Sequence, residues 1–343
     1  TVGYPRFAGY VRGEADGVPK TPEWAAALTE VPAGRIRALA RQMAAGRTLV
    51  TVSWSLQRAE HGEQPVWMGL VLAAMLGQIG LPGGGFGHGY GSSGDTGNPR
   101  RLFAPRLPQG ANGIDSYIPV ARIADMLLHP GAEYDYDGQR RRYPDVKLVY
   151  WCGGNPFHHH QHLARLREAF VRPQTVVVHD PFWTATARHA DIVLPSTMSV
   201  ERDDIGVGSS DSTLFAMPQL TEPHAQARDD YAAFGALADR LQVGEAFTEG
   251  RTVRQWLPHL YEQWRSDLKA AGHEVPSFDD FWAGESLEIP VPDPRQVLLS
   301  AFRRDPEGSA LRTPSGKIEI FSAAIDGFGY PDCPRHPVWL EPT

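Results

Sequence analysis

The sequence predicts an α/β fold: a Rossmann-like parallel sheet with helices on both faces, followed by an irregular C-terminal extension. Two observations predict it. Short runs rich in Val, Ile and Leu alternate with segments whose apolar residues recur at helical spacing. Polar or glycine-rich turns follow the apolar runs, as at the carboxyl ends of parallel strands. With 343 residues, 42% hydrophobic and 21% charged, the chain has a globular composition.

Helices are expected first, over a lead-in of residues 1–46 that belongs to the α/β region. Residues 21–23, Thr-Pro-Glu, are typical of a helix start, with an N-cap, a proline at the first helical position and an acid facing the helix dipole. A second helix is predicted over 32–45, where apolar residues have helical spacing, and Gly46 ends it.

Residues 47–275 are predicted to be the main α/β region, which carries the ligand site. The glycine-rich segment 80–113 shows no apolar period and is expected to be a loop, and 134–143 a charged connection. Predicted strands and helices otherwise alternate, with strands at 49–53, 146–151, 175–179 and 192–194 and helices at 64–79, 118–128, 159–170, 231–241 and 253–271.

Residues 276–343 are expected to form the irregular extension, because their proline and glycine content is high. One strand is predicted within it, at 318–320, after a turn at 314–316. We expect this extension to lead toward a C-terminal domain missing from the chain. The opening at Thr1, without Met or a leader, suggests that a preceding segment has been removed.

Charge and cysteine content exclude several classes of protein. A net charge of −7 argues against a nucleic-acid binder, and the basic run 140–142 is interpreted as a solvated loop. Cys152 and Cys333 cannot supply a disulfide framework, an iron–sulfur cluster or a structural zinc site. The most apolar stretch, 66–80, is shorter than the ~20 residues that span a bilayer, so we predict no membrane span.

The strongest candidate for a ligand site is the run from Tyr150 to Gln161. Gly153 and Gly154 have no Cβ, so the backbone can take a positive φ and approach a ligand closely. Pro156 suits the first turn of a following helix. His158 and His162 could share a helical face and bind zinc, but zinc needs three or four ligands, and anion recognition by the turn is favoured.

Two other strand ends are expected to meet this turn. His179 and Asp180 follow the apolar run 175–178, which would place them beside Asn155 in a crevice at the sheet edge. Arg58 follows the strand at 49–53 and is expected at the same edge. Its guanidinium either offers donors to an oxo or phosphate oxygen or pairs with a nearby glutamate.

Five long stretches resemble the molybdopterin oxidoreductases, in that family's order. Within the family, they are most similar to the branch of dimethyl sulfoxide, trimethylamine N-oxide and biotin sulfoxide reductases. The three adjacent histidines and the Phe-Trp-Thr-Ala-Thr-Ala-Arg run favour the biotin sulfoxide reductases, a cytoplasmic type; a periplasmic location is the alternative. The stretches are 54–64, 81–87, 150–161, 179–195 and 313–320.

The resemblance implies a molybdenum bis(molybdopterin guanine dinucleotide) enzyme that removes oxygen from an S-oxide or N-oxide. This chain would be its central region, and residues 47–275 would be the dinucleotide-binding α/β region that holds one dinucleotide. It would depend on an unidentified electron donor and on N- and C-terminal domains of the same protein, and it would be inactive alone. The molybdenum ligand, a serine in this branch, would lie upstream of Thr1, so no metal ligand is expected in the chain.

Residue by residue, the resemblance implies cofactor contacts at the glycine turn. Gly153, Gly154, Asn155 and His159 would line the phosphate and ribose path of the dinucleotide. Amide donors on a glycine turn suit a pyrophosphate.

The guanosine end would be held by residues that follow the next predicted strand. The resemblance implies His179, Asp180 and Trp183 there, with Arg202 nearby. Asp230 would accept hydrogen bonds from the guanine edge, whose N–H groups suit a carboxylate.

The molybdenum end would be lined by Trp54, Gln57 and Arg58, with Arg58 steering the oxide oxygen. Two other hypotheses stay open at this point. One is a non-redox module that binds a guanine nucleotide without molybdenum, and the other is a structural α/β domain without a ligand.

Overall fold

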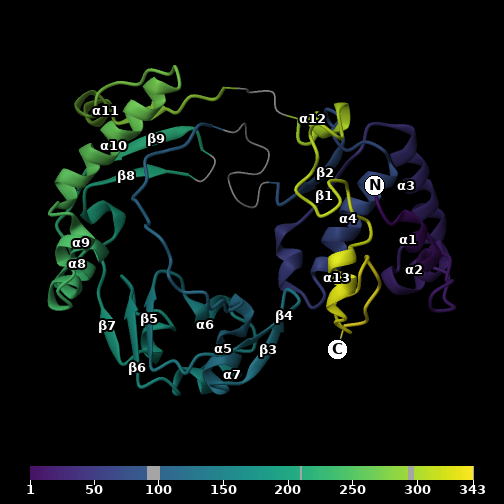
Figure 1. The fold of residues 1–343 in the computed structure, drawn as a ribbon, viewed down its shortest axis with the longest axis horizontal. Helices are drawn as coiled ribbons and strands as arrows, with labels where there is room; N and C mark the ends of the chain where they lie inside the picture. Colours follow the sequence, from purple (N-terminus) through teal and green to yellow (C-terminus); the bar gives the residue numbers. More distant parts are fainter. Residues whose placement is uncertain (91–100, 209–210, 293–296, 343) are drawn as a thin grey trace. The chain divides into compact units, whose positions relative to one another are not determined.

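The fold is mixed α/β, with small parallel and antiparallel sheets (Figure 1). The computed structural model describes residues 1–90, 101–208, 211–292 and 297–342. The chain forms two compact units. Unit 1 comprises residues 1–101, 209–211 and 291–343, and unit 2 comprises residues 102–208 and 212–290.

Unit 1 is mainly helical. Thr21 caps α2 as predicted, by accepting a hydrogen bond from the backbone N–H of Trp24. Val71 of α4 packs with Phe7 and Ile320 in a small core. The elements are α1 (Tyr4–Val11), α2 (Pro22–Thr29), α3 (Ala33–Ala45), β1 (Leu49–Val52), η1 (Trp54–Arg58), α4 (Glu63–Met75), β2 (Gly85–His88), α12 (Ser300–Arg304) and α13 (Ala323–Phe328).

The two strands of unit 1 pair with each other in parallel, in a sheet of their own. The expectation that the strand at 49–53 shares a sheet edge with Asn155 and Asp180 is therefore wrong. The prediction of a loop over 80–113 is wrong at β2, whose alternate residues Gly85 and Gly87 hide the apolar period of a strand. Residues 91–100 of that segment lie outside the described residues.

Unit 2 contains the other three sheets. Its strands are β3 (Glu133–Tyr136), β4 (Gln139–Arg142), β5 (Leu148–Cys152), β6 (Thr175–His179), β7 (Ile192–Leu194), β8 (Asp204–Val207), β9 (Thr213–Met217) and β10 (Ser286–Glu288). Its helices are η2 (Val120–Arg122), α5 (Ile123–Leu128), α6 (Pro156–His159), α7 (Leu163–Phe170), η3 (Ala187–His189), η4 (Ser199–Glu201), α8 (Asp230–Arg240), α9 (Gly244–Thr248), α10 (Val253–Ala270) and α11 (Phe278–Gly284).

Strands β5, β6 and β7 form a parallel sheet with helices on both faces. Side chains alternate between the two faces of a strand. Val176 and Val178 of β6 pack in a core with Leu166 of α7 and Leu127 of α5. His179 points to the opposite face, where Phe234 of α8 stacks on its ring. The predicted arrangement of parallel strands between helices is therefore present in these three strands.

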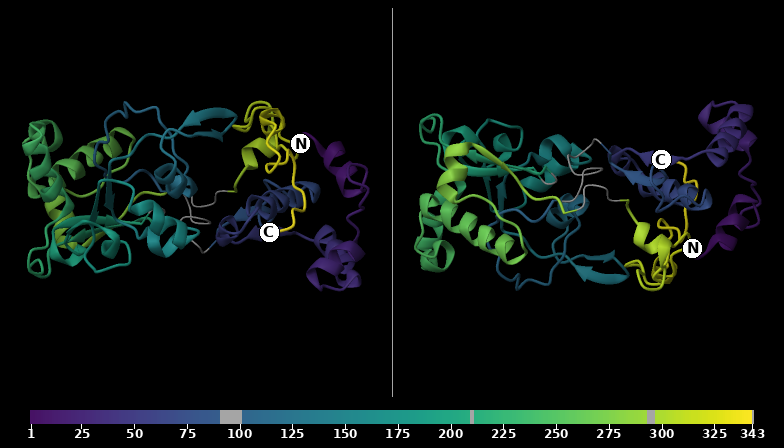
Figure 2. Two further views of the ribbon diagram at one scale, coloured as in Figure 1. Left: turned by 90° about the horizontal axis from the view of Figure 1, so that it is seen from below. Right: turned by 90° about the horizontal axis from the view of Figure 1, so that it is seen from above.

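A second sheet, in the order β10-β9-β8, is antiparallel and packs against α10 (Figures 1 and 2). Leu214 of β9 shares a buried cluster with Tyr261 and Leu268 of α10. Burial raises the pKa of the Tyr261 hydroxyl, which donates a hydrogen bond to the carbonyl of Pro276. The sequence predicted α10 but none of these three strands.

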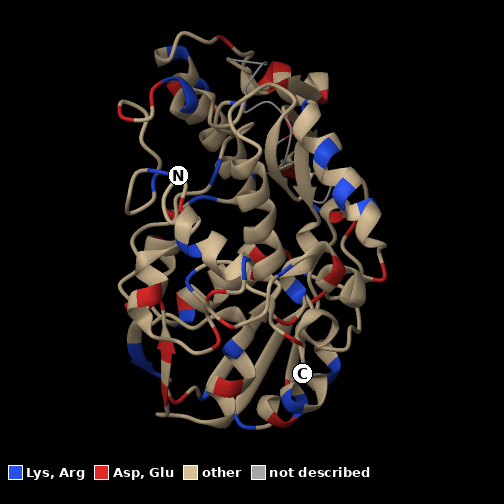
Figure 3. Cartoon of the chain, turned by 90° about the vertical axis from the view of Figure 1, so that its right-hand side faces the viewer, with Lys and Arg blue, Asp and Glu red and all other residues tan. Residues whose placement is uncertain are grey.

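Residues 134–143, interpreted from the sequence as a charged connection with a solvated arginine loop, form the β3–β4 hairpin. Two of its arginines face carboxylates on the neighbouring strand. Arg140 pairs with Asp135 at 3.1 Å and Arg142 with Glu133 at 3.2 Å. Positive and negative side chains are likewise interspersed elsewhere along the chain (Figure 3).

Four further predictions need correction. The helix expected over 159–170 is two helices, α6 and α7, and the one over 118–128 begins as the short η2. Residues 318–320 form only an isolated bridge, between Glu319 and Val2. The region expected to be irregular contains α11, β10, α12 and α13. Within the described residues, no helix is long and apolar enough to cross a membrane.

Candidate functional site

The carboxyl ends of the three parallel strands in unit 2 are aligned. Cys152 of β5 pairs with His179 of β6, and His179 pairs with Leu194 of β7. The polar residues that follow each strand therefore leave the sheet at one edge. This confirms, for β5 and β6, that the turn after residue 152 and the pair His179-Asp180 lie at a common edge.

The turn after β5 has the backbone that the sequence predicted. Gly153 and Gly154 have φ values of +73° and +74°, a region that side chains rarely allow. Both residues are exposed, and a Cβ on Gly153 would meet no atom within 4 Å. Pro156 begins α6, as expected. The turn therefore presents open backbone to a ligand.

Asn155 and Asp180 both brace the loop that follows β6. The Asn155 Oδ1 atom accepts hydrogen bonds from the backbone N–H of Thr186, at 3.2 Å, and from its hydroxyl. Asp180 accepts from the backbone N–H of Phe182, at 2.9 Å, and from the hydroxyl of Thr184, at 3.0 Å. Loop 180–187 is thus fixed between the glycine turn and the end of β6.

His179 is the centre of a buried polar chain. Its side chain is 2% exposed, and its Nδ1 atom donates to Asp230 Oδ1 at 2.7 Å. Its Nε2 atom can then accept from the Tyr150 hydroxyl, also at 2.7 Å. Burial, followed by the charges of Cys152 and Asp230, raises the pKa of Tyr150. Burial, followed by the charge of Asp230, also raises the pKa of the Cys152 thiol.

Asp230 combines this buried contact with exposure, since its side chain is 55% exposed. It begins α8, where the preceding Asp229 is the N-cap and accepts from the backbone N–H of Ala232 at 2.7 Å. One carboxylate oxygen is thus held by His179. Asp230 therefore keeps acceptor capacity for a ligand, because an ionised carboxylate has several lone-pair sites.

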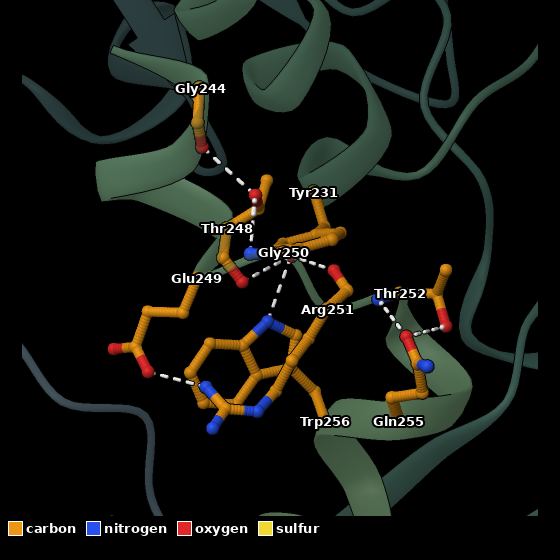
Figure 4. A network of polar contacts seen from close by, with 9 residues as sticks. All are labelled: Tyr231, Gly244, Thr248, Glu249, Gly250, Arg251, Thr252, Gln255 and Trp256. Atoms are coloured by element: carbon orange, nitrogen blue, oxygen red, sulfur yellow. Dashed lines mark hydrogen bonds and ion pairs between the residues drawn. The ribbon is translucent and has the colours of Figure 1, made fainter.

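A polar network fixes the residue after Asp230 (Figure 4). The Tyr231 hydroxyl donates to the carbonyl of Arg251 at 2.6 Å and accepts from the indole N–H of Trp256 at 2.8 Å. The Arg251 guanidinium lies over the Trp256 ring, 4.7 Å from its centroid. The start of α8, and with it Asp230, is therefore anchored to the start of α10.

The remaining predicted residues of unit 2 lie around this edge with different partners. Trp183 is in the braced loop and is 69% exposed. Arg202 donates to the carbonyl of Thr197 and pairs with Asp204, both at 3.2 Å. His159 ends α6, and a Cβ on Gly154 would stand 3.8 Å from its Nε2 atom.

The histidine cluster does not share one helical face. His158 lies in α6, whereas His162 caps α7 with a left-handed backbone and accepts from the backbone N–H of Arg165. The helical spacing assumed for the pair is broken by residues 160–162. Among the described residues, no group of three or more His, Cys, Asp or Glu side chains could hold a metal ion.

Trp54, Gln57 and Arg58 belong to unit 1 and lie on η1, directly after β1. The Trp54 indole stacks on the imidazole of His88, with ring centroids 5.2 Å apart. The parallel pairing of β1 and β2 produces this contact, because it aligns His88 with Val52.

Sequence reasoning assigned no role to Thr186, Phe234 or Tyr150, which hold the named residues in place, although Tyr150 opens the run predicted to be the ligand site. Thr184 and Thr186 flank Ala185 in the run after Asp180, and this alternation was the available signal for one half-buried and one buried hydroxyl. Nothing in the sequence indicated that Tyr150 and Phe234 contact His179, because aromatic residues in a strand and a helix are ordinary core residues.

Residues 20–240 match the family described as molybdopterin oxidoreductase, which is more than half of the chain. The chain belongs to the molybdopterin oxidoreductase family. The resemblance found in the sequence is confirmed. The same residues include β5, β6 and β7 and every side chain at their common edge.

Several molybdopterin oxidoreductases are similar to the chain over its whole length. It is 50% identical to a biotin sulfoxide reductase of Cereibacter sphaeroides, of which it covers 46%. It is 48% identical to a dimethyl sulfoxide/trimethylamine N-oxide reductase of Rhodobacter capsulatus, of which it covers 43%. A trimethylamine-N-oxide reductase of Haemophilus influenzae is 44% identical and covered to 44%. The chain thus spans less than half the length of these relatives.

Proposed function

We propose that the chain is the central cofactor-binding region of a molybdenum oxidoreductase that reduces S-oxides or N-oxides. The single observation that carries this proposal is the grouping of the glycine turn, Asp180 and the His179–Asp230 pair at one sheet edge, in a chain of this family. The names of the relatives support the class of substrate.

The proposed ligand of unit 2 is one guanine dinucleotide of a molybdenum bis(molybdopterin guanine dinucleotide) cofactor. Gly153 and Gly154 would take its phosphates, because their N–H groups make no hydrogen bond within the described residues and no side chain crowds Gly153. On this proposal, β5, β6 and β7 are part of a Rossmann-like sheet, which binds nucleotides at the carboxyl ends of its strands.

The guanine is assigned to Asp230, whose exposed carboxylate is already oriented by His179. Guanine N–H groups would donate to it in charge-assisted hydrogen bonds. Trp183 offers an exposed aromatic surface on the braced loop, and Arg202 would lie toward the ribose. The site therefore fits the nucleotide half of the cofactor.

Trp54, Gln57 and Arg58 are proposed to contact the molybdenum end of the cofactor and the oxide, and this assignment rests on the resemblance. The cofactor would supply the two-electron oxygen-transfer chemistry. The protein would bind the dinucleotide, orient the oxide by the donors of Arg58 and exclude water. We infer that the molybdenum ligand, the second dinucleotide site and the docking of the electron donor come from the rest of the full-length protein.

Analysis of the full-length protein tests this proposal. We expect two guanine nucleotides for each molybdenum atom, as a bis(molybdopterin guanine dinucleotide) cofactor requires. We also expect reduction of dimethyl sulfoxide or trimethylamine N-oxide by a reduced viologen dye. Guanine nucleotide without molybdenum would favour the alternative, a non-redox nucleotide-binding module. Protein that contains neither would contradict both and leave a structural domain.

A further inference from the structure

Tyr150 of β5 and His179 of β6 point to the same face of the parallel sheet. Tyr150 pairs with Val177, two residues before His179, and side chains two residues apart along a strand share a face. The rings of Tyr150 and His179 have centroids 5.3 Å apart, and Phe234 of α8 stacks on His179 with 16° between the ring planes. His179 is therefore held between one aromatic ring from the sheet and another from a helix.

Both ring nitrogens of His179 are within hydrogen-bond distance of an oxygen. Nδ1 lies 2.7 Å from Oδ1 of Asp230 and donates to it, because an ionised carboxylate only accepts. Nε2 lies 2.7 Å from the hydroxyl oxygen of Tyr150. Burial raises the pKa of Tyr150, so its hydroxyl keeps its proton at neutral pH and donates to Nε2. The Tyr150 hydroxyl thus favours the tautomer of His179 that carries its proton on Nδ1.

This chain of hydrogen bonds leads from the core to an exposed carboxylate. The side chain of His179 is 2% exposed, whereas that of Asp230 is 55% exposed. An exposed carboxylate without a partner would occupy several rotamers, and a ligand would have to select one of them. The contact with His179 fixes one oxygen of Asp230 and leaves the other for a ligand. The orientation of Asp230 therefore depends on a ring that Tyr150 holds in place.

We propose that Tyr150 is a positioning residue for the cofactor: through His179, its hydroxyl orients the Asp230 carboxylate toward the guanine of the dinucleotide. This inference rests on the proposed function, in which Asp230 binds the guanine. The N–H groups of guanine donate best to a carboxylate held in one orientation. On this proposal Tyr150 makes no contact with the cofactor, and it affects how long the cofactor stays bound.

The test measures the release of cofactor from purified full-length protein at a temperature below that of unfolding. Guanine nucleotide and molybdenum that leave the protein are measured after filtration. Tyr150→Phe removes the hydroxyl and keeps the ring, and His179→Phe keeps a ring against Phe234 but removes both hydrogen bonds. The matched control is Tyr261→Phe, because Tyr261 is buried elsewhere in unit 2 and its hydroxyl donates to the carbonyl of Pro276 at 3.0 Å.

We expect Tyr150→Phe to release the cofactor about three- to tenfold faster, the usual effect of one lost hydrogen bond. Tyr261→Phe should lose similar stability and release the cofactor at the wild-type rate. In the His179→Phe background, Tyr150→Phe should add no further increase, because its hydroxyl acts only through His179. A residue that merely stabilises the sheet would speed release by the same factor in both backgrounds.

Two results would overturn the positioning role of Tyr150 and leave the proposed function intact. One is release at the wild-type rate from Tyr150→Phe or, if that variant does not fold, from His179→Phe. The other is an increase by Tyr150→Phe that persists in the double variant. Wild-type protein without molybdenum and guanine nucleotide would overturn the proposed function and this inference with it.

Discussion

At the scale of single residues, the proposed phosphate site depends on backbone that only glycine adopts easily. Gly153 and Gly154 are consecutive left-handed residues directly after β5. No side chain of this turn separates the chain from a ligand. The absence of two Cβ atoms therefore leaves the backbone of this turn accessible to the proposed ligand.

A substitution at Gly153 separates this binding role from simple strain. Gly153→Ala should cost about 1 kcal/mol of stability through its positive φ. It should also lower the guanine nucleotide and molybdenum content of the full-length protein, because the new methyl group occupies the space in front of the turn. Metal and nucleotide analysis measures the second effect.

The control is Gly131→Ala. Gly131 has a φ of +77° and, like Gly153, would place its Cβ in open space. Both variants should lose similar stability, but only Gly153→Ala should lose cofactor. Equal cofactor content in the two would contradict a phosphate-binding turn.

At the scale of elements, the helices and the apolar parallel strands were predicted better than β2 and the antiparallel strands. The strands β5 and β6 are five-residue, mostly apolar runs, and α10 has a long apolar period, so local sequence was sufficient. In β2, two of four residues are glycine, and β4 consists of Gln139 and three arginines. Pairing with a partner strand fixes these segments, and a single sequence does not show such pairing.

The same distinction applies to the site. The residues on the turns after β5 and β6 were identified from the sequence, because glycine, asparagine and aspartate after an apolar run indicate a turn at the end of a strand. Tyr150 and Phe234 both contact His179, from which they are 29 and 55 residues away in the chain. An aromatic residue in a strand or a helix gives no local indication of such a contact. The prediction that β1 ends at the same sheet edge as β5 and β6 failed, because a single sequence does not specify which strands pair.

The loop after β6 should depend on Thr186, which is fully buried. Thr186→Val keeps the shape but removes the hydroxyl that bonds Asn155. We expect a local loss of about 1–2 kcal/mol, seen as faster hydrogen exchange over 180–187 in the full-length protein. Thr29→Val, at an exposed helix end, is the control. Unchanged exchange in Thr186→Val would show that the Thr186 hydroxyl does not brace the loop.

Helices α5 and α7 are joined by Asp125, which gives a pH dependence. Burial acts to raise the Asp125 pKa, but hydrogen bonds from Tyr143 and Arg165 lower it overall. A carboxylate with a lowered pKa stabilises the folded state at neutral pH, and that stability is lost as pH falls through the folded-state pKa.

Asp125→Asn should therefore speed hydrogen exchange in α5 and α7 at pH 7. The difference in exchange rate between Asp125→Asn and the wild-type protein should become smaller as the pH falls toward and below the ordinary aspartate pKa of 3.8. A difference that stays constant from pH 7 to the acid limit would contradict an ionised Asp125 in this role.

At the scale of the whole molecule, the chain corresponds to less than half the length of the curated relatives it matches. We assign two groups of residues to one cofactor, and the grounds differ. The groups are the residues at the common edge of β5, β6 and β7 in unit 2 and the residues of η1 in unit 1. The edge rests on contacts in the structure, whereas Trp54, Gln57 and Arg58 rest on the resemblance. Any test of the cofactor assignment should begin with unit 2.

The most direct measurement is the guanine nucleotide and molybdenum content of full-length Asp230→Asn, beside Asp229→Asn. Asparagine at 230 keeps an oxygen for His179 but removes the charge that would bind guanine N–H groups, and asparagine at 229 can still cap α8. The account predicts a clear loss of both nucleotide and molybdenum in Asp230→Asn alone. Full cofactor content in Asp230→Asn would contradict it.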